Sequence, residues 1–279
     1  PQHAFDEAAL KAWLQERVSG FGRSLKVEQF KGGQSNPTFL LTGDHGRYVL
    51  RRKPPGPLLP SAHAVDREFR VISALQGSAV PVARTHALCT DDAVIGSWFY
   101  VMDFVEGRVL WDPRLPDMSP AQRGEHYAEL GRVMAELHRI DPVAVGLADY
   151  GKPGNYLQRQ VARWTAQYRA AETERIEAVE RLIEWLPAHL PPPESQGESV
   201  AIVHGDYRFD NVIFHPTEPR ILAVLDWELS TLGHPLVDFA YHCMSWHMAS
   251  SEGSRGLAGA DLAALGIPTE AQYLQAYLQ

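Results

Sequence analysis

The chain has 279 residues, with 26 Lys plus Arg, 34 Asp plus Glu and 12 His, which gives a formal charge of −8 when His is neutral. This acidic balance excludes a general nucleic-acid-binding protein, which would present a basic face. A hydrophobic share of 45% excludes a disordered chain. The sequence has no run of about 18 consecutive apolar residues, so we expect neither a membrane-spanning helix nor a membrane partner.

The first third of the chain predicts a small sheet with one helix before it and one across it. Residues 6–19 form the first predicted helix, with its apolar positions on one face. Extended runs follow at 25–30, 38–42 and 47–53, and the last two are joined by a hairpin at 43–46. Prolines from Pro54 end the third strand, because proline cannot donate to a strand ladder.

Helical spacing then returns before a second pair of strands. Val65, Phe69, Ile72 and Leu75 recur with the period of one helix face. The strand pair that follows ends in the run 97–102. We therefore expect an N-terminal lobe over residues 1–105, built on an antiparallel sheet.

The rest of the chain is mainly helical. Ser119 begins a capping box with proline at the first helical position. Residues 155–186 predict one long helix or two, the proline-rich segment 191–198 predicts a surface loop, and residues 236–248 predict a further helix. Three short strands are expected in between, at 200–203, 211–214 and 221–225. This gives a bilobal α+β architecture, with a hinge at about 102–106 and a larger C-terminal lobe at 106–279.

Cellular context follows from the two cysteines and the first residues. Cys89 and Cys243 lie far apart, so they predict neither a disulfide framework nor a paired-cysteine metal site. Two buried thiols in a reducing cytoplasm are the expectation. The start, from Pro1 to Glu7, lacks the basic and apolar regions of a signal peptide.

The strongest chemical signal is the pattern H-x-D-x-x-x-x-N at His204–Asn211, between two predicted strands. Twenty residues after Asp206, a third strand ends in Asp226. A phosphoryl-transfer site needs these parts. An aspartate orients and deprotonates the acceptor hydroxyl, and an asparagine and a second aspartate hold Mg²⁺ against the phosphates of ATP. We therefore predict Asp206 as the base, and Asn211 and Asp226 as metal ligands.

The N-terminal lobe supplies matching parts for a nucleotide. The loop 31–36 carries Gly33, Ser35 and Asn36 in a hairpin, where a nucleotide-binding loop is expected. Arg51 lies on the third strand, on the face opposite Leu50. Glu68 lies on the following helix, so the pair Arg51–Glu68 is predicted to mimic the Lys–Glu ion pair of kinases.

These stretches resemble the aminoglycoside phosphotransferase and choline kinase superfamily of protein-kinase-like enzymes. The similarity runs from Gly32 to Asp238 and is greatest to the kinase-like domain fused to some acyl-CoA dehydrogenases. It rests on the stretches 33–38, 49–56 and 225–235. It implies ATP between two lobes, with adenine at the hinge residues Met102, Asp103 and Val105. It also implies that Asp238 braces the catalytic loop.

Two departures accompany the resemblance. Arg51 stands where many kinases have lysine; arginine keeps its charge but presents a planar fork, so Lys53 is an alternative phosphate ligand. The chain also stops inside an apolar-periodic segment, 274–279, so we expect the acceptor side of the C-terminal lobe to be incomplete in this sequence.

The acceptor is predicted to be a small hydroxylated molecule, and its identity stays open. Arg208 is a candidate contact to phosphate or acceptor. Charge is balanced over 155–186 and only slightly acidic over 230–279, which fits a polycationic aminoglycoside poorly. Aromatic and methionine side chains near 239–248 would suit an acyl chain, as in a hydroxyacyl-CoA, or would form a helical core stripe.

Two functions from other classes compete with a kinase. A metal-dependent hydrolase built on His204 and Asp206 would be better supported by H-x-D-x-H, but position 208 is Arg. A nucleotide-binding module that has lost catalysis would be favoured by loss of Asp206, Asn211 or Asp226, and all three are present. The oligomeric state cannot be predicted from these patterns.

Overall fold

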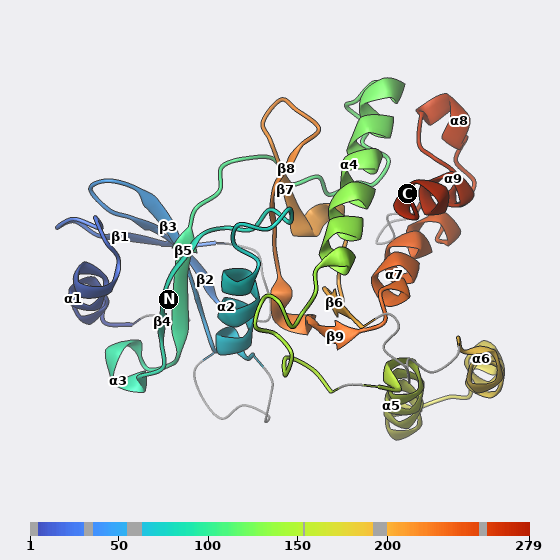
Figure 1. Cartoon of the computed structure of the whole chain (residues 1–279), viewed down its shortest axis with the longest axis horizontal. Coiled ribbons are helices and arrows are strands. Elements are labelled where there is room, and N and C mark those ends of the chain that lie inside the picture. Colours follow the sequence, from blue (N-terminus) through green and yellow to red (C-terminus); the bar gives the residue numbers. More distant parts are fainter. Residues whose placement is uncertain (1–4, 31–35, 55–62, 153, 192–199, 251–255) are drawn as a thin grey trace.

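The computed structural model describes residues 5–30, 36–54, 63–152, 154–191, 200–250 and 256–279. The fold is bilobal and α+β, as predicted, with the sheet at one end and most helices at the other (Figure 1). The first elements along the chain are α1 (Glu7–Arg17), β1 (Lys26–Gln29), β2 (Thr38–Thr42), β3 (Arg47–Arg52), α2 (Val65–Ala74), β4 (Thr85–Cys89), α3 (Asp92–Ile95) and β5 (Phe99–Asp103).

The N-terminal sheet has five antiparallel strands in the order β1-β2-β3-β5-β4. Its two faces carry different partners, because side chains alternate along each strand. Leu50 lies in the core cluster that also contains residues of α1, whereas Tyr100 of β5 lies in the cluster that contains residues of α2. The predicted face of Arg51 follows from this alternation, since Arg51 points to the α2 side opposite Leu50.

The C-terminal lobe is built around the long helix α4 (Pro120–Arg139). Ser119 and Gln122 form the predicted capping box, and Pro120 occupies the first turn. The remaining helices are α5 (Tyr156–Ala171), α6 (Glu177–His189), α7 (Leu236–His247), α8 (Leu262–Leu265) and α9 (Glu270–Tyr277). Side chains of α4, α7 and α9 share the larger core cluster, which fixes α7 behind the functional site.

Two small sheets lie within this lobe. Strand β6 (Ala201–Val203) pairs with β9 (Thr231–Gly233), and β7 (Val212–Phe214) pairs with β8 (Ile221–Val224). Three of these strands match the predicted runs within a residue or two. Strand β9 was missed, because a three-residue strand has no readable period and is defined only by its partner.

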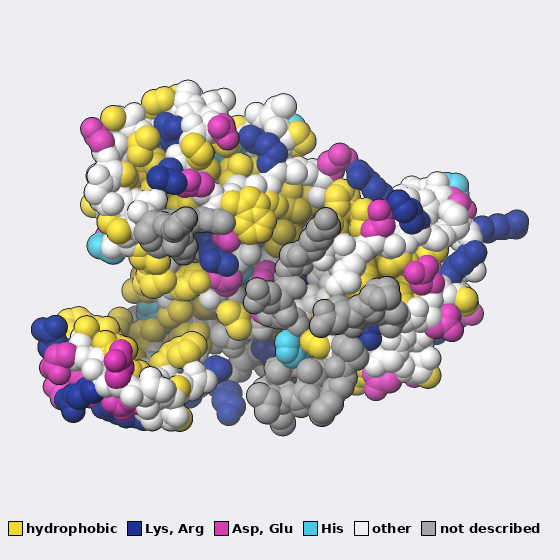
Figure 2. All heavy atoms as spheres, turned by 180° about the vertical axis from the view of Figure 1, so that it is seen from behind, with side chains coloured by type: hydrophobic (Ala, Val, Ile, Leu, Met, Phe, Trp, Pro, Cys, Tyr) yellow, Lys and Arg dark blue, Asp and Glu magenta, His cyan; other side chains and the backbone are white. Residues whose placement is uncertain are grey.

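The region 155–186 forms two helices, which settles a choice that the periodicity left open. The turn between α5 and α6 is held by Arg169, whose guanidinium pairs with both oxygens of Glu180 at 2.5 and 2.6 Å. Figure 2 shows these two helices projecting from the lobe, with a hollow between them and the part that carries α4, α7 and α9. The predicted loop at 191–198 lies almost wholly outside the described residues.

The expected burial of the two cysteines is confirmed. Cys89 and Cys243 are buried free thiols, and burial raises the pKa of Cys243 to about 12. Within the described parts of the chain, none of the helices combines the length and apolar character needed to cross a bilayer.

Candidate active site

The predicted catalytic loop connects β6 to β7. Asp238 of α7 is buried beneath it and accepts hydrogen bonds from the backbone N–H groups of His204 and Gly205, both at 2.7 Å. Gly205 adopts φ +86°, a conformation that glycine permits, and a Cβ there would meet Leu229 at 2.9 Å. Asp238 thus makes the contacts that the bracing role implies.

His204 links the two sides of the site through its ring. The Nδ1 atom accepts from the N–H of Asp206 at 3.2 Å, and Nε2 donates to the carbonyl of Leu225 at 2.7 Å. Both ring nitrogens are therefore bonded to backbone groups. This arrangement supports the interpretation of His204 as a structural member of the loop.

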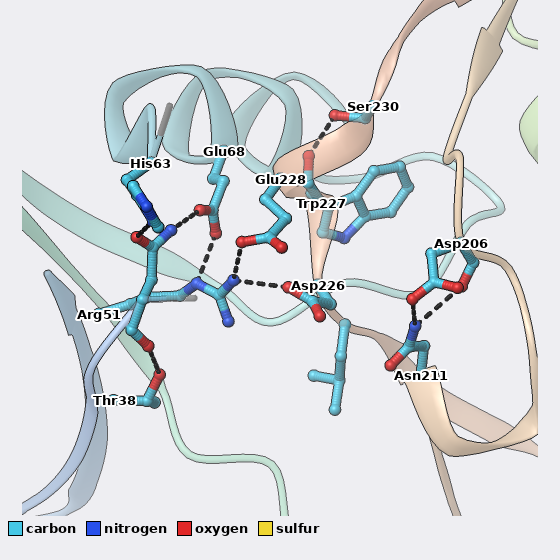
Figure 3. Close-up of polar contacts among 12 residues, drawn as sticks. Thr38, Arg51, His63, Glu68, Asp206, Asn211, Asp226, Trp227, Glu228 and Ser230 are labelled. Carbon is cyan, nitrogen blue, oxygen red and sulfur yellow. Dashed lines mark hydrogen bonds and ion pairs between the residues drawn. The ribbon is translucent and has the colours of Figure 1, made fainter. Parts of the chain in front are cut away.

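Asp206 and Asn211 lie at the two ends of the loop and contact each other. The Asn211 Nδ2 group donates to the backbone carbonyl of Asp206 at 2.8 Å and to its Oδ2 at 2.7 Å (Figure 3). The Arg208 Nε lies 3.3 Å from Asp206 Oδ1 and 3.1 Å from Asp210 Oδ1. The loop thus presents a partly exposed carboxylate whose orientation is fixed by an amide and a guanidinium.

Asp226 follows β8 and is brought to the catalytic loop by backbone contacts. The N–H of Leu225 donates to the carbonyl of Asn211 at 2.8 Å. Asp226 has φ +60°, in the left-handed region where Asp and Asn are enriched among non-glycine residues. Such sparsely populated conformations cluster at active sites, because the surrounding structure has to hold them.

Arg51 reaches from β3 to the C-terminal lobe (Figure 3). Its Nε lies 2.8 Å from Glu68 Oε2, which confirms the predicted pair. Its Nη2 lies 2.5 Å from Asp226 Oδ1 and 3.2 Å from Glu228 Oε2. One guanidinium therefore joins β3, α2 and the segment after β8.

Burial shifts the pKa values of the charged side chains around Arg51. It raises the pKa of Glu68, whose side chain is 1% exposed, to about 7, although Arg51 opposes the shift. Tyr100 Oη and Asn36 Nδ2 also donate to the Glu68 carboxylate, at 3.0 and 2.7 Å. Burial works against the charge of Arg51, but the surrounding carboxylates outweigh it and raise the Arg51 pKa.

The predicted nucleotide loop is placed only in part. Gly33 and Ser35 lie outside the described residues. Asn36 is buried, and its side chain contacts Glu68 and His63 rather than an open surface. Asn36 is predicted to contact the nucleotide directly, but in the structure its side chain is turned toward Glu68 of α2. The reason is that β2 begins just after Asn36 and fixes the backbone there.

The hinge segment leaves β5 toward the C-terminal lobe. Met102 pairs with Val49 of β3 in the sheet. The Asp103 carboxylate is hydrogen-bonded to His86 Nε2 at 2.6 Å, and the backbone N–H of Asp103 donates to the carbonyl of Arg84. Val105 follows the end of the strand. The side chain of Asp103 is therefore already held by β4.

Lys53 lies away from the carboxylates that surround Arg51. Its Nζ lies 4.0 Å from the centroid of the Trp98 ring and 3.8 Å from Asp66 Oδ1. Lys53 comes directly after β3, which carries Arg51, yet of these two cations only Arg51 contacts Glu68 and Asp226.

Sequence reasoning missed Glu228 near this centre, and it placed Tyr241 in a possible acceptor pocket without predicting its contact with Asp206. Glu228, two residues after Asp226 in a 3-10 turn (Trp227–Leu229), contacts Arg51. Its only signal was an acidic residue beside Asp226. Tyr241 hydrogen-bonds the Asp206 carboxylate, and burial together with that bond raises the pKa of Tyr241 to about 12. No local pattern marks this contact with Asp206, since it depends on how α7 packs under the loop.

A cavity of about 640 Å³ opens beside the catalytic loop. Its walls include Arg208, Tyr241 and the loop before α4. Trp111, Met244 and Met248 also line it and are 60, 47 and 44% exposed, so an apolar ligand could reach them. The predicted aromatic stripe on α7 thus divides, because Phe239 and Trp246 are buried in the core while other members face the cavity.

The oxygen atoms present fit a magnesium ion that shares its ligands with phosphate. Asp226, Glu228 and Asn211 offer carboxylate and amide oxygens, the hard ligands that Mg²⁺ prefers. The guanidinium of Arg51 between two of these carboxylates shows that this position accommodates positive charge. Among the described residues, no group of three or more His, Cys, Asp or Glu is arranged to hold a metal ion.

Comparison with known proteins agrees with this arrangement. The model of the phosphotransferase enzyme family matches residues 26–275. Acyl-CoA dehydrogenase family member 10 of Mus musculus is 46% identical over 278 residues, which are 99% of this chain and 25% of that protein. The chain spans about a quarter to a third of the length of the curated relatives it matches.

Solved structures share the fold over nearly the whole chain. A Ralstonia eutropha protein, provisionally named an aminoglycoside phosphotransferase, is 57% identical with a TM-score of 0.89, and the match covers 98% of this chain and 80% of that one. An aminoglycoside phosphotransferase in a ternary complex with streptomycin and ATP has 17% identity and a TM-score of 0.62, covering 99% and 83% of the two chains. The second likeness is one of fold.

Proposed function

The chain belongs to the phosphotransferase enzyme family, and we propose that it transfers the γ-phosphoryl group of ATP to a hydroxyl group of a small molecule, with Mg²⁺ as the metal. The proposal rests on one arrangement of contacts. Asn211 contacts Asp206, a backbone hydrogen bond joins Asn211 to the residue before Asp226, and Arg51 from the other lobe pairs with Asp226. These are the parts that phosphoryl transfer needs: a base, oxygen ligands for the metal and a cation for the phosphates.

The roles follow from the positions of the side chains. Asp206 would accept the proton of the acceptor hydroxyl as the hydroxyl oxygen bonds to the γ-phosphorus, while the bond from that phosphorus to the ADP oxygen breaks. Asn211 and Asp226 would hold Mg²⁺, which supplies charge neutralisation at the phosphates. Arg51 would bind the phosphates and Glu68 would orient it. We assign adenine recognition to backbone groups of the hinge at Met102 and Val105, because the Asp103 carboxylate is bonded to His86.

A coupled assay of ADP release tests the proposal on the chain with a panel of hydroxylated metabolites, aminoglycosides and hydroxyacyl-CoA thioesters. We expect ADP formation that depends on an acceptor and on magnesium. MgATP binding without turnover on any hydroxyl acceptor would instead favour the inactive nucleotide-binding module. Hydrolysis of a substrate without any need for nucleotide would favour a hydrolase.

The cavity beside Asp206 favours an apolar hydroxylated acceptor, such as a hydroxyacyl-CoA, over a polycation. Each carboxylate that lines it in the described part of the chain stands beside an arginine: Asp112 pairs with Arg114 at 2.6 Å, and Asp210 with Arg208 at 3.1 Å. A site for an aminoglycoside needs a dense group of uncompensated carboxylates. The names of the curated relatives, acyl-CoA dehydrogenase family members, also favour an acyl-CoA compound.

Acceptor preference can be measured as kcat/KM for matched substrates. We expect a hydroxyacyl-CoA to exceed kanamycin-type aminoglycosides by at least about 10²-fold in kcat/KM, because the cavity offers it apolar contacts and the described carboxylates there are paired with arginines. Met244→Glu should raise the KM for the acyl substrate while leaving the KM for MgATP unchanged. Efficient phosphorylation of aminoglycosides, with none of any hydroxyacyl-CoA, would leave the kinase assignment but refute this acceptor.

Arg51 and Lys53 make a second testable comparison. Arg51→Ala should lower kcat/KM for MgATP by about 10²-fold, because it removes the cation that lies against Asp226. Lys53→Ala should change it by less than about threefold, since its ion pair with Asp66 is long, at 3.8 Å, and partly exposed, and such pairs contribute little. Steady-state kinetics at saturating magnesium measure both. The reverse order would show that Lys53 binds the phosphates.

A further inference from the structure

Helix α2, which carries Glu68, is attached to the C-terminal lobe through Tyr150. This tyrosine lies in the loop after α4 and is 1% exposed. Its hydroxyl lies 3.1 Å from the backbone carbonyl of Arg67 in α2 and 2.8 Å from the Ser230 Oγ. Ser230 Oγ lies in turn 2.5 Å from the carbonyl of Trp227 (Figure 3). Each hydroxyl carries one proton, so two of these three contacts are hydrogen bonds at a time, and the Tyr150 hydroxyl lies between the α2 carbonyl and Ser230.

Arg67 strengthens the same attachment from the other side. Its Nη2 donates to the carbonyl of Tyr150 at 2.7 Å and lies 3.4 Å from that of Ser230. The Arg67 guanidinium also stacks 4.2 Å from the centroid of the Tyr150 ring. One turn further along α2, Arg70 donates to the carbonyl of Gly146 at 2.9 Å. The loop that ends at Tyr150 thus holds one face of α2.

The residues that this attachment joins are the immediate neighbours of the proposed phosphate and metal groups. Arg67 precedes Glu68, and Trp227 follows Asp226. Arg51 spans Glu68 and Asp226 by its own ion pairs. The separation of these two carboxylates is therefore set twice, once by the guanidinium and once by the two hydroxyls behind it.

The second attachment matters when the first is released. If Asp226 binds the metal of MgATP, its carboxylate no longer belongs to Arg51 alone. Glu68 must then keep Arg51 in place without help from Asp226. The contact through Tyr150 and Ser230 uses backbone carbonyls, which do not change partners when the nucleotide binds.

We propose that Tyr150 is a positioning residue that holds α2 against the turn after Asp226, so that Glu68 and Arg51 stay aligned on the phosphates of MgATP. The inference rests on the proposed function, because it assigns a role toward the nucleotide that this function requires. The competing interpretation is that Tyr150 only fills the core, in which case its ring would matter and its hydroxyl would not.

Tyr150→Phe separates these interpretations, because it keeps the ring and removes the hydroxyl. We expect the Kd and KM for MgATP to rise by about 3- to 10-fold, the range expected for the loss of one or two buried hydrogen bonds. Binding of ATP with EDTA in place of the metal should change less. Tyr127→Phe is the matched control, since Tyr127 is also buried and donates one hydrogen bond, to the carbonyl of Pro113 at 2.7 Å. It should leave MgATP affinity unchanged.

A double-mutant cycle with Arg51→Ala tests whether Tyr150 acts through Arg51. In the Arg51→Ala background, Tyr150→Phe should add less than about twofold to the MgATP Kd, because no guanidinium remains to be aligned. Calorimetry measures these affinities without turnover, and thermal melts show whether each variant folds. Equal effects of Tyr150→Phe in both backgrounds would refute the role of Tyr150 and leave the proposed function intact. The same holds if Tyr150→Phe does not change MgATP affinity while the wild type is active. A wild-type chain that does not bind MgATP would overturn this role and the proposed function together.

Discussion

Asp206→Asn is expected to lower the rate of phosphoryl transfer by about 10²- to 10⁴-fold, the usual contribution of a positioned base. The amide is nearly the same size as the carboxylate but cannot accept the proton of the acceptor hydroxyl. Asn211 donates to the backbone carbonyl of Asp206 as well as to its carboxylate, and the backbone bond survives the substitution. The loop should therefore keep its shape and the KM for MgATP should remain within about twofold.

Single-turnover kinetics measure this effect without the influence of product release. Asp210→Asn provides a comparison on the same loop, because Asp210 also lies beside Arg208. It should change the KM for the acceptor more than the rate of transfer, since Asp210 lines the cavity. An Asp206→Asn variant with most of the wild-type rate would show that another group takes the proton.

Asp226→Ala is expected to lower activity by at least about 10³-fold at ordinary magnesium concentrations, because a metal ion supplies several kcal/mol of charge stabilisation. The loss should be larger than that caused by Asn211→Ala, since a carboxylate attracts a dication more strongly than an amide does. The substitution also removes one of the carboxylates around Arg51, so the guanidinium would remain with Glu68 and Glu228.

The conformation of Asp226 calls for a second variant. Alanine is disfavoured at φ +60°, whereas asparagine tolerates it. Asp226→Asn should therefore retain the melting temperature and still require far more magnesium than the wild type. Titration of the rate against magnesium concentration is the measurement. If neither variant changes the magnesium requirement, Asp226 does not bind the metal.

Much of the fold could be read from local pattern. Helices α1, α2 and α4 and strands β2 and β3 follow from apolar period, capping residues and turn residues that lie within a few positions of one another. The loop from His204 to Asn211 was also recognisable, because its spacing places the proposed base and one proposed metal ligand on a single loop between strands. In each case the determining interactions are short in sequence, so the chain carries the information locally.

Only the tertiary structure decided the contacts that join the lobes. Arg51 meets Asp226 across 175 positions of sequence, and Tyr150 meets the carbonyl of Arg67 across 83. No periodic signal accompanies such pairs, because their geometry depends on how β3, α2 and the turn after β8 are packed. The same reason explains why strand β9 and the role of Tyr241 were missed, whereas the Arg51–Glu68 pair could be predicted from the resemblance to kinases. The sequence determined which chemical groups are present, and packing over long sequence distances determined which of them meet.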